Sequence, residues 1–435
     1  MLTFLGFAMV IAFMYLIMSK RLSALIALIL VPILFAIFGG FATEIGPMML
    51  AGITKLAPTG VMLMFAILYF ALMIDSGLFD PAVRQILRWV KGDPMKVSVG
   101  TAVLALVVSL DGDGATTYMI CVAAMLPLYS RIGMSPRIMA GLIILAGGIM
   151  NMTPWGGPTA RAASALHVEA SDIFVPMIPA MFAGVVALLL IAYFYGKRER
   201  ARLGELHLQG DEADHSEISV SQFPDARRPK MIWFNGALTL VLMISLIMSL
   251  LPLPVLFMIA FSIAMIINYP NMQDQKDRVA AHAGSVLSVV GLIFAAGIFT
   301  GILTGTGMVD AMSKSLLAVI PDAMGPYLAV ITALVSMPFT FFMSNDAFYF
   351  GVLPVLTEAA AHYGISPVEM ARASIVGQPV HLLSPLVPST YLLVALAGIE
   401  FGDHQRFTLK WAVLICLCIM VAALLMGIFP FYSSL

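Results

Sequence analysis

The sequence predicts an all-α polytopic membrane protein built from two inverted repeats, and three observations support this fold class. Of the 435 residues, 61% are hydrophobic and only 11% are charged, with a mean hydropathy of +0.99. Several apolar runs reach the ~20 residues that a helix needs to cross a bilayer. Two interrupted apolar stretches of the N-terminal half also recur 230–231 residues later in the C-terminal half. The net charge of −1 gives no support for nucleic acid binding.

We expect residues 1–196 to form the first repeat, with five membrane spans and one helical hairpin. The segment 95–130 is apolar over about 36 residues and has a polar break near its middle. Because one span needs only ~20 residues, we interpret it as a re-entrant hairpin that enters and leaves on the same side. An amphipathic segment, 80–93, precedes it. The spans are expected at 2–18, 22–41, 58–76, 136–168, which is broken, and 173–196.

A charged segment, 197–230, is expected to be a cytoplasmic linker between the repeats. The second repeat covers 231–435, with a hairpin at 325–362 that follows an amphipathic segment at 310–322. Between the windows 133–159 and 364–390, 8 of 27 positions are identical without a gap. Five spans is an odd number, so the second repeat must sit inverted in the membrane. Its spans are expected at 231–250, 253–268, 281–305, 366–400, which is broken, and 407–429.

The distribution of positive charge predicts the orientation in the lipid bilayer. If the N-terminus lies outside, 19 of the 23 Lys and Arg residues fall in inside loops. Such a bias is typical of cytoplasmic loops. The three cysteines lie in apolar runs without metal-ligand spacing, so we expect neither a disulfide nor a permanent cofactor.

The tip of the first expected hairpin carries two carboxylates, Asp111 and Asp113, next to glycines. Two close carboxylates bind a cation or share a proton, because each raises the pKa of the other. The alternative is a cytosolic turn that is simply rich in Asp and Gly. The long apolar flanks favour a site within the membrane, where ionisable residues are costly.

The tip of the second expected hairpin offers a hydroxyl, an amide and a carboxylate from Ser344, Asn345 and Asp346. These are hard oxygen ligands of the kind that alkali and alkaline-earth cations prefer. A helix-capping turn is compatible with this reading, since Ser and Asn commonly begin helices. We therefore group the tip with Asp111 and Asp113 as candidates for metal or proton binding.

Paired prolines break the helices at 151–159 and 384–390, and freed backbone groups are tolerated at membrane depth only where they line a polar cavity. Two nearby ionisable residues leave alternatives open. Arg161 pairs with a substrate carboxylate or with Asp113, or it is simply buried against an acidic side chain, and His381 relays protons or packs. A simple kink is the alternative for the breaks. The candidate substrate-binding residues are Asn151, Thr153, Gly156, Gly157, Thr159, Arg161, Ser384, Pro385, Ser389 and Thr390.

Several long motifs resemble the CitMHS family, bacterial citrate–divalent metal:proton symporters of the ion transporter superfamily. They are Ser109-Leu-Asp-Gly-Asp-Gly-Ala-Thr-Thr-Tyr118, Asn345-Asp-Ala-Phe-Tyr-Phe350, Gly377-Gln-Pro-Val-His-Leu-Leu-Ser-Pro-Leu-Val-Pro-Ser-Thr-Tyr391 and Phe401-Gly-Asp-His-Gln-Arg-Phe407. The resemblance implies uptake of citrate as a complex with Mg²⁺ or Ca²⁺, driven by protons. It also implies a homodimer in the bacterial plasma membrane, with an elevator-type scaffold domain and a mobile transport domain.

Two other functions are alternatives to metal–citrate symport. A Na⁺-coupled di- or tricarboxylate symporter is the rival among transporters, but two carboxylates at the first tip suit a divalent cation or a proton better than Na⁺. An intramembrane aspartyl protease also uses two membrane aspartates. That class needs them on separate helices, and it leaves the inverted repeat unexplained, so we expect no enzyme.

Overall fold

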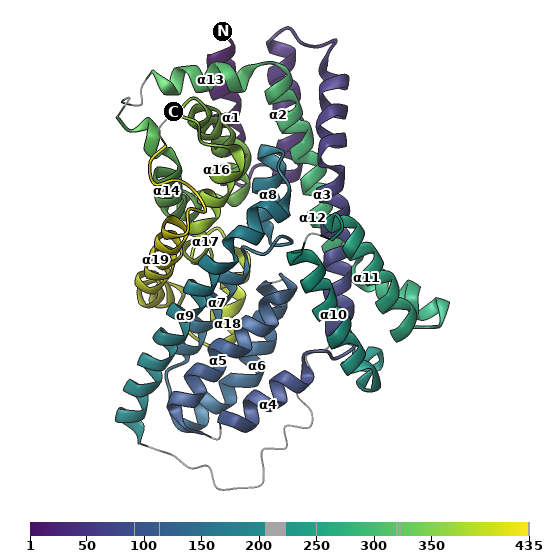
Figure 1. The fold of residues 1–435 in the computed structure, drawn as a ribbon, viewed down its shortest axis with the longest axis vertical. Coiled ribbons are helices and arrows are strands. Elements are labelled where there is room, and N and C mark those ends of the chain that lie inside the picture. Colours follow the sequence, from purple (N-terminus) through teal and green to yellow (C-terminus); the bar gives the residue numbers. More distant parts are fainter. Residues whose placement is uncertain are drawn as a thin grey trace.

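The computed structural model describes every residue except 91, 113, 205–222, 249, 319–320, 322 and 434–435, and the side chains of residues 18, 111, 224 and 317 are also outside the description. All regular structure among the described residues is helical. The described ends of the chain lie near the same end of the elongated molecule, and the end of α9 and helix α4 lie at the other (Figure 1).

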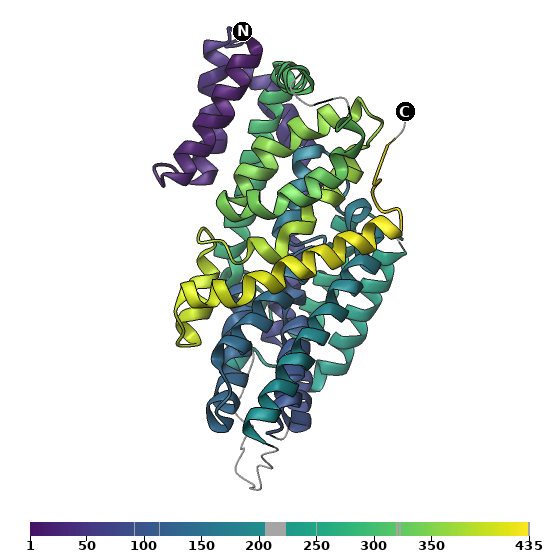
Figure 2. The same cartoon turned by 90° about the vertical axis from the view of Figure 1, so that its left-hand side faces the viewer.

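The N-terminal half begins with two helices that stand beside the rest of the molecule (Figure 2). A short 3₁₀ turn, η1 (Ser109–Asp111), separates the paired helices α5 and α6. The helices are α1 (Leu2–Met18), α2 (Ala24–Phe38), α3 (Ile45–Asp75), α4 (Asp80–Val90), α5 (Pro94–Val108), α6 (Gly114–Ile132), α7 (Pro136–Met150), α8 (Gly157–Leu166) and α9 (Ala170–Leu203).

The C-terminal half ends with α19, which runs obliquely across one face of the molecule (Figure 2). A π-helical turn, η6 (Ala347–Val352), leads into α15, and the 3₁₀ turn η7 (Ile375–Gly377) leads into α17. The helices are α10 (Ile232–Ile247), α11 (Leu253–Asn268), α12 (Met272–Gly305), α13 (Met308–Leu317), α14 (Leu328–Phe342), α15 (Leu353–Ala361), α16 (Pro367–Ser374), α17 (Gln378–His381), α18 (Pro388–Leu396) and α19 (Phe401–Leu425).

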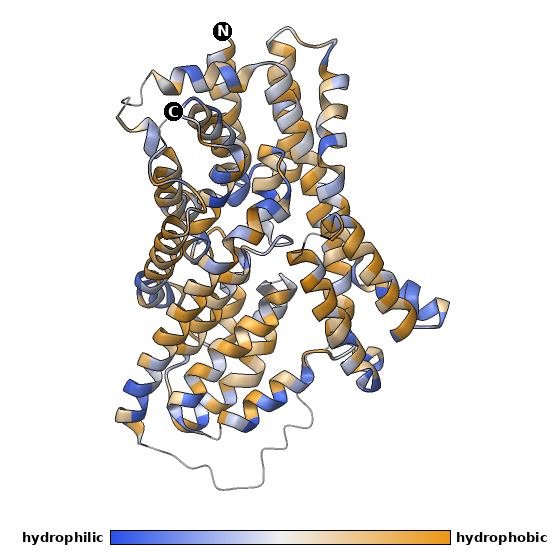
Figure 3. Cartoon of the chain, in the orientation of Figure 1, coloured by the Kyte–Doolittle hydropathy of each residue, from blue (hydrophilic) through white to orange (hydrophobic). Residues whose placement is uncertain are grey.

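Among the described residues, seven helices are long and apolar enough to cross a membrane, and several shorter apolar helices accompany them. Hydrophobic residues run along most of the long helices, whereas many hydrophilic residues gather at helix ends (Figure 3). The prediction of an all-α polytopic membrane protein is therefore confirmed.

Helix α3 is longer than the hydropathy pattern predicts, and close packing accounts for its added first part. Helix α3 begins at Ile45 rather than 58, because its less hydrophobic first half packs against α12. A Cβ atom built on Gly52 of α3 would lie only 1.9 Å from the carbonyl oxygen of Gly297 of α12. Such contact requires glycine and is typical of membrane helices that pack through small residues.

The segment expected as linker is partly structured at both ends. Helix α9 continues through Leu203, so residues 197–203 are helical rather than part of a loop. At the other end, the backbone N–H of Arg228 donates to the Ser76 carbonyl, and its Nε donates to the Asn268 carbonyl at 2.8 Å. Arg227 pairs with Asp80 at the start of α4. Residues 227 and 228 are thus held against α3, α4 and α11.

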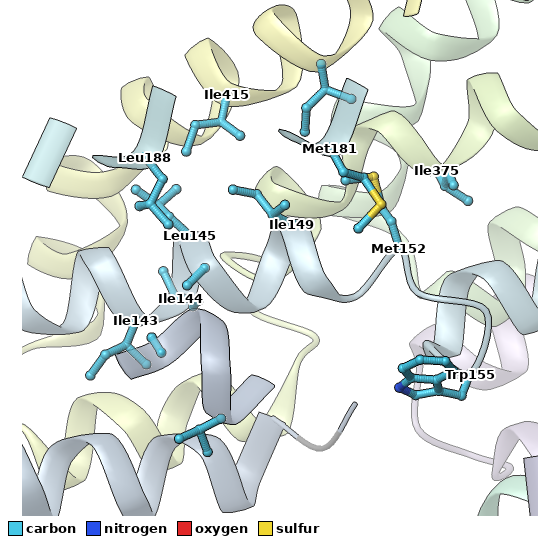
Figure 4. Close-up of a cluster of buried hydrophobic side chains, with 14 of the residues drawn as sticks. Ile143, Ile144, Leu145, Ile149, Met152, Trp155, Met181, Leu188, Ile375 and Ile415 are labelled. Atoms are coloured by element: carbon cyan, nitrogen blue, oxygen red, sulfur yellow. The ribbon is translucent and has the colours of Figure 1, made fainter. Parts of the chain in front are cut away.

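The apolar core surrounds α7, whose side chains point toward α9 and α19 (Figure 4). Ile149 of α7, Leu188 of α9 and Ile415 of α19 belong to one cluster and are almost fully buried. Burying an aliphatic side chain of this size contributes roughly 1.5–3 kcal/mol. The packing holds α7 in a fixed position, and α7 ends at the first helix break.

Candidate functional site

Four polar segments interrupt the helices in the middle of the fold. The first tip, residues 109–114, lies between α5 and α6, and the second tip, residues 343–346, lies between α14 and η6. The first break, residues 151–156, lies between α7 and α8, and the second break, residues 382–387, lies between α17 and α18. Side-chain contacts connect these segments to one another and to the opposite half of the chain.

The first contact joins the first tip to the first break, because Trp155 Nε1 donates to the Leu110 carbonyl at 2.9 Å. The second joins the first half of the chain to the second tip. Arg161 Nε, one turn into α8, lies 2.6 Å from Asp346 Oδ1, and the two side chains are 21% and 15% exposed. This ion pair spans 185 positions of sequence. It realises the alternative in which Arg161 pairs with an acidic side chain.

A cavity of about 150 Å³ lies between the first tip and the two breaks. The hydroxyl of Ser109, at the rim of the first tip, is buried and has no hydrogen-bond partner among the described residues. Two predicted site residues, Asn151 and Ser389, contribute to the wall. The lining residues are Ser109, Gly112, Gly114, Thr117, Tyr118, Gly147, Asn151, Leu382 and Ser389.

Two helix N-termini meet at this cavity. A Cβ atom built on Gly114, the first residue of α6, would lie 3.5 Å from Ser389 Oγ in the first turn of α18. Backbone N–H groups at helix N-termini carry partial positive charge and favour anions. The C-terminal end of α7 reaches the same cavity through Asn151, its C-cap residue. The arrangement can hold an anionic group, with amide and hydroxyl oxygens available to a cation.

A sequence model of the CitMHS family, described as "Citrate transporter", matches residues 10–377. The chain belongs to the CitMHS family of citrate transporters. A "Citrate transporter" of Bacillus subtilis (strain 168) is 61% identical over 431 residues, which are 99% of this chain and 100% of the relative. The "Mg(2+)/citrate complex secondary transporter" of the same organism is 55% identical, covering 98% and 99% of the two chains.

Two solved transporters share the fold of this CitMHS family member. The YdaH transporter of Alcanivorax borkumensis superposes with a TM-score of 0.57 at 16% identity, covering 89% of this chain and 88% of that one. MtrF of Neisseria gonorrhoeae, which is described as illuminating a class of antimetabolite efflux pumps, gives a TM-score of 0.58 at 15% identity, covering 89% of this chain and 84% of that one. At these identities the likeness concerns the fold alone.

Several hydroxyls of the predicted set close the helix breaks of this CitMHS protein. Thr159 Oγ1 donates to the Met152 carbonyl at 2.9 Å, and Thr390 Oγ1 donates to the Leu382 carbonyl. Ser384 Oγ donates to the carbonyl of Phe341 at 2.6 Å, which ties the second break to the second hairpin. The two threonines thus satisfy carbonyls within the breaks, and Ser384 satisfies a carbonyl in the last turn of α14. The Thr153 hydroxyl is buried and has no partner among the described residues.

The other predicted residues of the second half differ in their surroundings. Ser344 Oγ accepts the backbone N–H of Ala347 at 3.2 Å, as the capping reading anticipated. His381 is buried, and its Nδ1 lies 2.7 Å from the Thr340 carbonyl, which matches the packing reading. The Pro385 side chain is exposed, and the Pro385 carbonyl accepts from the Tyr391 hydroxyl.

Gly156, the last residue of the first break, is required by space, because a Cβ atom on it would lie 2.1 Å from the Asn151 carbonyl oxygen. A Cβ atom on Gly157, the first residue of α8, would lie 2.7 Å from Arg161 Nη1, so a larger residue there would displace the guanidinium group. Asp113 lies outside the described residues, and so does the side chain of Asp111.

The sequence analysis missed Gln378, which is fully buried at the centre of the site. Its Oε1 accepts from Asn151 Nδ2 at 3.1 Å, and its Nε2 donates to Asn345 Oδ1 at 3.4 Å and to the Tyr349 hydroxyl at 2.9 Å. Gln378 is not ionisable and lies outside both breaks, so neither signal marked it. Its position among prolines in a broken span could have marked it.

Proposed function

We propose that this CitMHS family protein is a proton-driven symporter that takes up citrate as a complex with a divalent metal ion. The convergence of two hairpin tips and two helix breaks on one polar region carries the proposal. Substrate sites of secondary transporters characteristically lie where broken helices of two repeats meet. The B. subtilis relative that is 55% identical is named for the Mg²⁺/citrate complex, which supports the choice of substrate.

The two sides of this region suit different parts of the cargo. The cavity at the first tip offers Asn151, Ser389 and helix N-termini to a citrate carboxylate. The other candidate substrate-binding residues of the breaks would hold the wall of this cavity in place. Asp111 and Asp113, with the second tip, would bind the metal or the protons, since carboxylate and amide oxygens suit Mg²⁺ and Ca²⁺.

Arg161 and Asp346 provide a direct means of coupling protons to citrate. While Asp346 is ionised, it holds the Arg161 guanidinium at 2.6 Å. Protonation of Asp346 removes the negative charge and frees Arg161 for a citrate carboxylate, an anionic partner of the same geometry. Release of the proton on the other side of the membrane restores the ion pair and expels the carboxylate.

The inverted repeat is supported by a contact between positions that a shift of 231 residues relates. A Cβ atom on Gly148 of α7 would lie 2.5 Å from the Pro379 Cα atom of α17. A residue touches its own repeat equivalent only close to a twofold axis, so the axis of the repeat would pass through this contact. Both repeats, 1–196 and 231–435, would then supply one tip and one break to one site.

The membrane orientation, the dimer and the elevator motion remain part of the proposal. The end with α4 and the C-terminus of α9 would face the cytoplasm, because the linker and most Lys and Arg residues belong to it. The family resemblance implies a homodimer whose transport domain moves against a fixed scaffold.

Uptake into proteoliposomes tests the proposed function. Labelled citrate should accumulate when a divalent metal and an inward proton gradient are both present, and it should not accumulate when either is removed. Replacing Na⁺ by choline should have no effect. Uptake that requires Na⁺ and ignores the metal would instead identify a Na⁺-coupled carboxylate symporter.

A further inference from the structure

The Asn151–Gln378 contact has a repeat-related counterpart that lacks its polar groups. A shift of 231 residues relates Gly147 to Gln378 and Leu382 to Asn151. A Cβ atom on Gly147 would lie 3.4 Å from Leu382 Cδ1, so the equivalent positions also lie side by side. The Gly147–Leu382 pair is apolar and borders the cavity. In the Asn151–Gln378 pair, side-chain amides occupy the corresponding positions and form a hydrogen bond.

Gln378 is held in place from both sides by backbone packing. The preceding residue, Gly377, approaches α14 so closely that a Cβ atom on it would lie 2.8 Å from the Met337 nitrogen. The following residue, Pro379, lies against Gly148 of α7. Since neither neighbour has room to shift, the side-chain amide of Gln378 starts from a fixed point between the two halves of the site.

The hydrogen bonds of Gln378 orient one asparagine on each side of the site. By accepting from Asn151 Nδ2, it fixes which way the Asn151 amide faces at the cavity wall. By donating to Asn345 Oδ1, it occupies the oxygen that a cation at the second tip would use. The Tyr349 hydroxyl, which donates to the Ser374 carbonyl, accepts from the same Nε2 and holds the amide plane.

We propose that Gln378 is a positioning residue that couples the cavity at the first tip to the cation chemistry of the second tip. The proposal rests on the proposed function of the site. When Asn345 Oδ1 turns to a cation, it gives up the Gln378 N–H, and the Gln378 amide is free to readjust toward Asn151. Ligand contacts at Asn151 and at Asn345 then change each other's free energy, and this coupling is reciprocal.

A double-mutant cycle on citrate binding to the purified full-length protein tests the coupling. Asn151→Ala, Asn345→Ala and the double variant are compared with wild type, at saturating Mg²⁺, by calorimetry. For each variant, we consider the factor by which the Kd for citrate increases relative to the protein that has both asparagines. With Gln378 present, the factor of the double variant should differ from the product of the two single-variant factors by about fivefold or more, and this ratio is the interaction factor. In a Gln378→Met background, the Kd increase of the double variant should equal the product of the two single-variant increases to within about twofold.

Two further variants separate coupling from a merely structural role. Gln378→Glu retains an oxygen for Asn151 but has no N–H for Asn345, so the interaction factor should again vanish while the protein keeps its monodisperse elution. Gln405→Met, which removes an amide that donates to the Leu383 carbonyl, is the matched control and should leave the factor unchanged.

An interaction factor that survives Gln378→Met or Gln378→Glu, or one that is absent already in the protein with Gln378, overturns the coupling while the proposed function stands. Wild-type protein that binds citrate neither with Mg²⁺, nor with Ca²⁺, nor alone contradicts the proposed function and the coupling together.

Discussion

At the scale of single residues, the ion pair between Arg161 and Asp346 is the charged contact that joins the two halves of the site. Each residue was a separate candidate in the sequence, but their pairing depends on how α8 meets the second tip. A single sequence carries no signal that two residues 185 positions apart are in contact. The same holds for Gln378, whose importance comes from neighbours that only the fold brings together.

Replacing Arg161 by Met should strongly reduce citrate transport. It leaves the Asp346 carboxylate without its partner in a largely buried site and removes the proposed carboxylate ligand. We expect kcat/KM for citrate uptake to fall at least ~10-fold. Arg137→Met is the control, because Arg137 and Asp403 are half exposed and 3.7 Å apart, and exposed pairs contribute little. Equal losses in the two variants would contradict the role of Arg161.

At the scale of elements, Trp155 fixes the first tip relative to the first break. Its indole packs between Phe70 of α3 and Phe257 of α11, with ring centroids 4.9 and 5.4 Å away, while Nε1 holds the Leu110 carbonyl. This hydrogen bond therefore helps to fix the position of the first tip.

Trp155→Phe should therefore raise the KM for citrate several-fold, because the ring stays but the donor to the first tip is lost. Trp411→Phe is a matched control, since it removes an indole N–H that donates to the Tyr195 hydroxyl, outside the residues that line the cavity. Uptake kinetics of both variants decide the matter. A KM that is unchanged in Trp155→Phe would show that the first tip needs no such support.

The glycine contact between α3 and α12 gives a prediction for stability. Gly52→Ala should destabilise the protein by about 1–3 kcal/mol, because its Cβ would lie 1.9 Å from a backbone oxygen and the helices must separate. Gly46→Ala in the same helix meets nothing within 4 Å and should be neutral or slightly stabilising. Thermal unfolding in detergent compares the two. A Gly52→Ala protein as stable as Gly46→Ala would mean that the helices are less closely packed.

The sequence predicted elements better than it predicted their contacts. Helix α11 matches its expected span, 253–268, because an uninterrupted apolar run leaves little choice of boundary. Helix α3 was predicted too short, since residues 45–57 are less hydrophobic and meet α12 at a close glycine contact through Gly52, which hydropathy does not register. The helices end at 150 and 381, where prolines and glycines of the sequence predict breaks. That the first tip and the two breaks line one cavity depends on helix packing and could only be hypothesised.

At the scale of the whole molecule, the proposed orientation can be checked directly. In a background with the native cysteines replaced, Ala42→Cys between α2 and α3 should react with an impermeant maleimide added to intact cells. Arg131→Cys, near the end of α6, should react only after the membrane is opened. Both positions are exposed, so accessibility of the side chain does not limit the reaction. The reverse labelling pattern would place the N-terminus inside.

The central claim is that citrate and a divalent metal ion cross the membrane together through the site where the two halves meet. Proteoliposomes given labelled citrate and labelled divalent metal under an inward proton gradient measure both fluxes at once. The account predicts equal amounts of the two, lost together in Arg161→Met. Citrate that accumulates without the metal, or metal that enters at its full rate in the variant that no longer carries citrate, would contradict it.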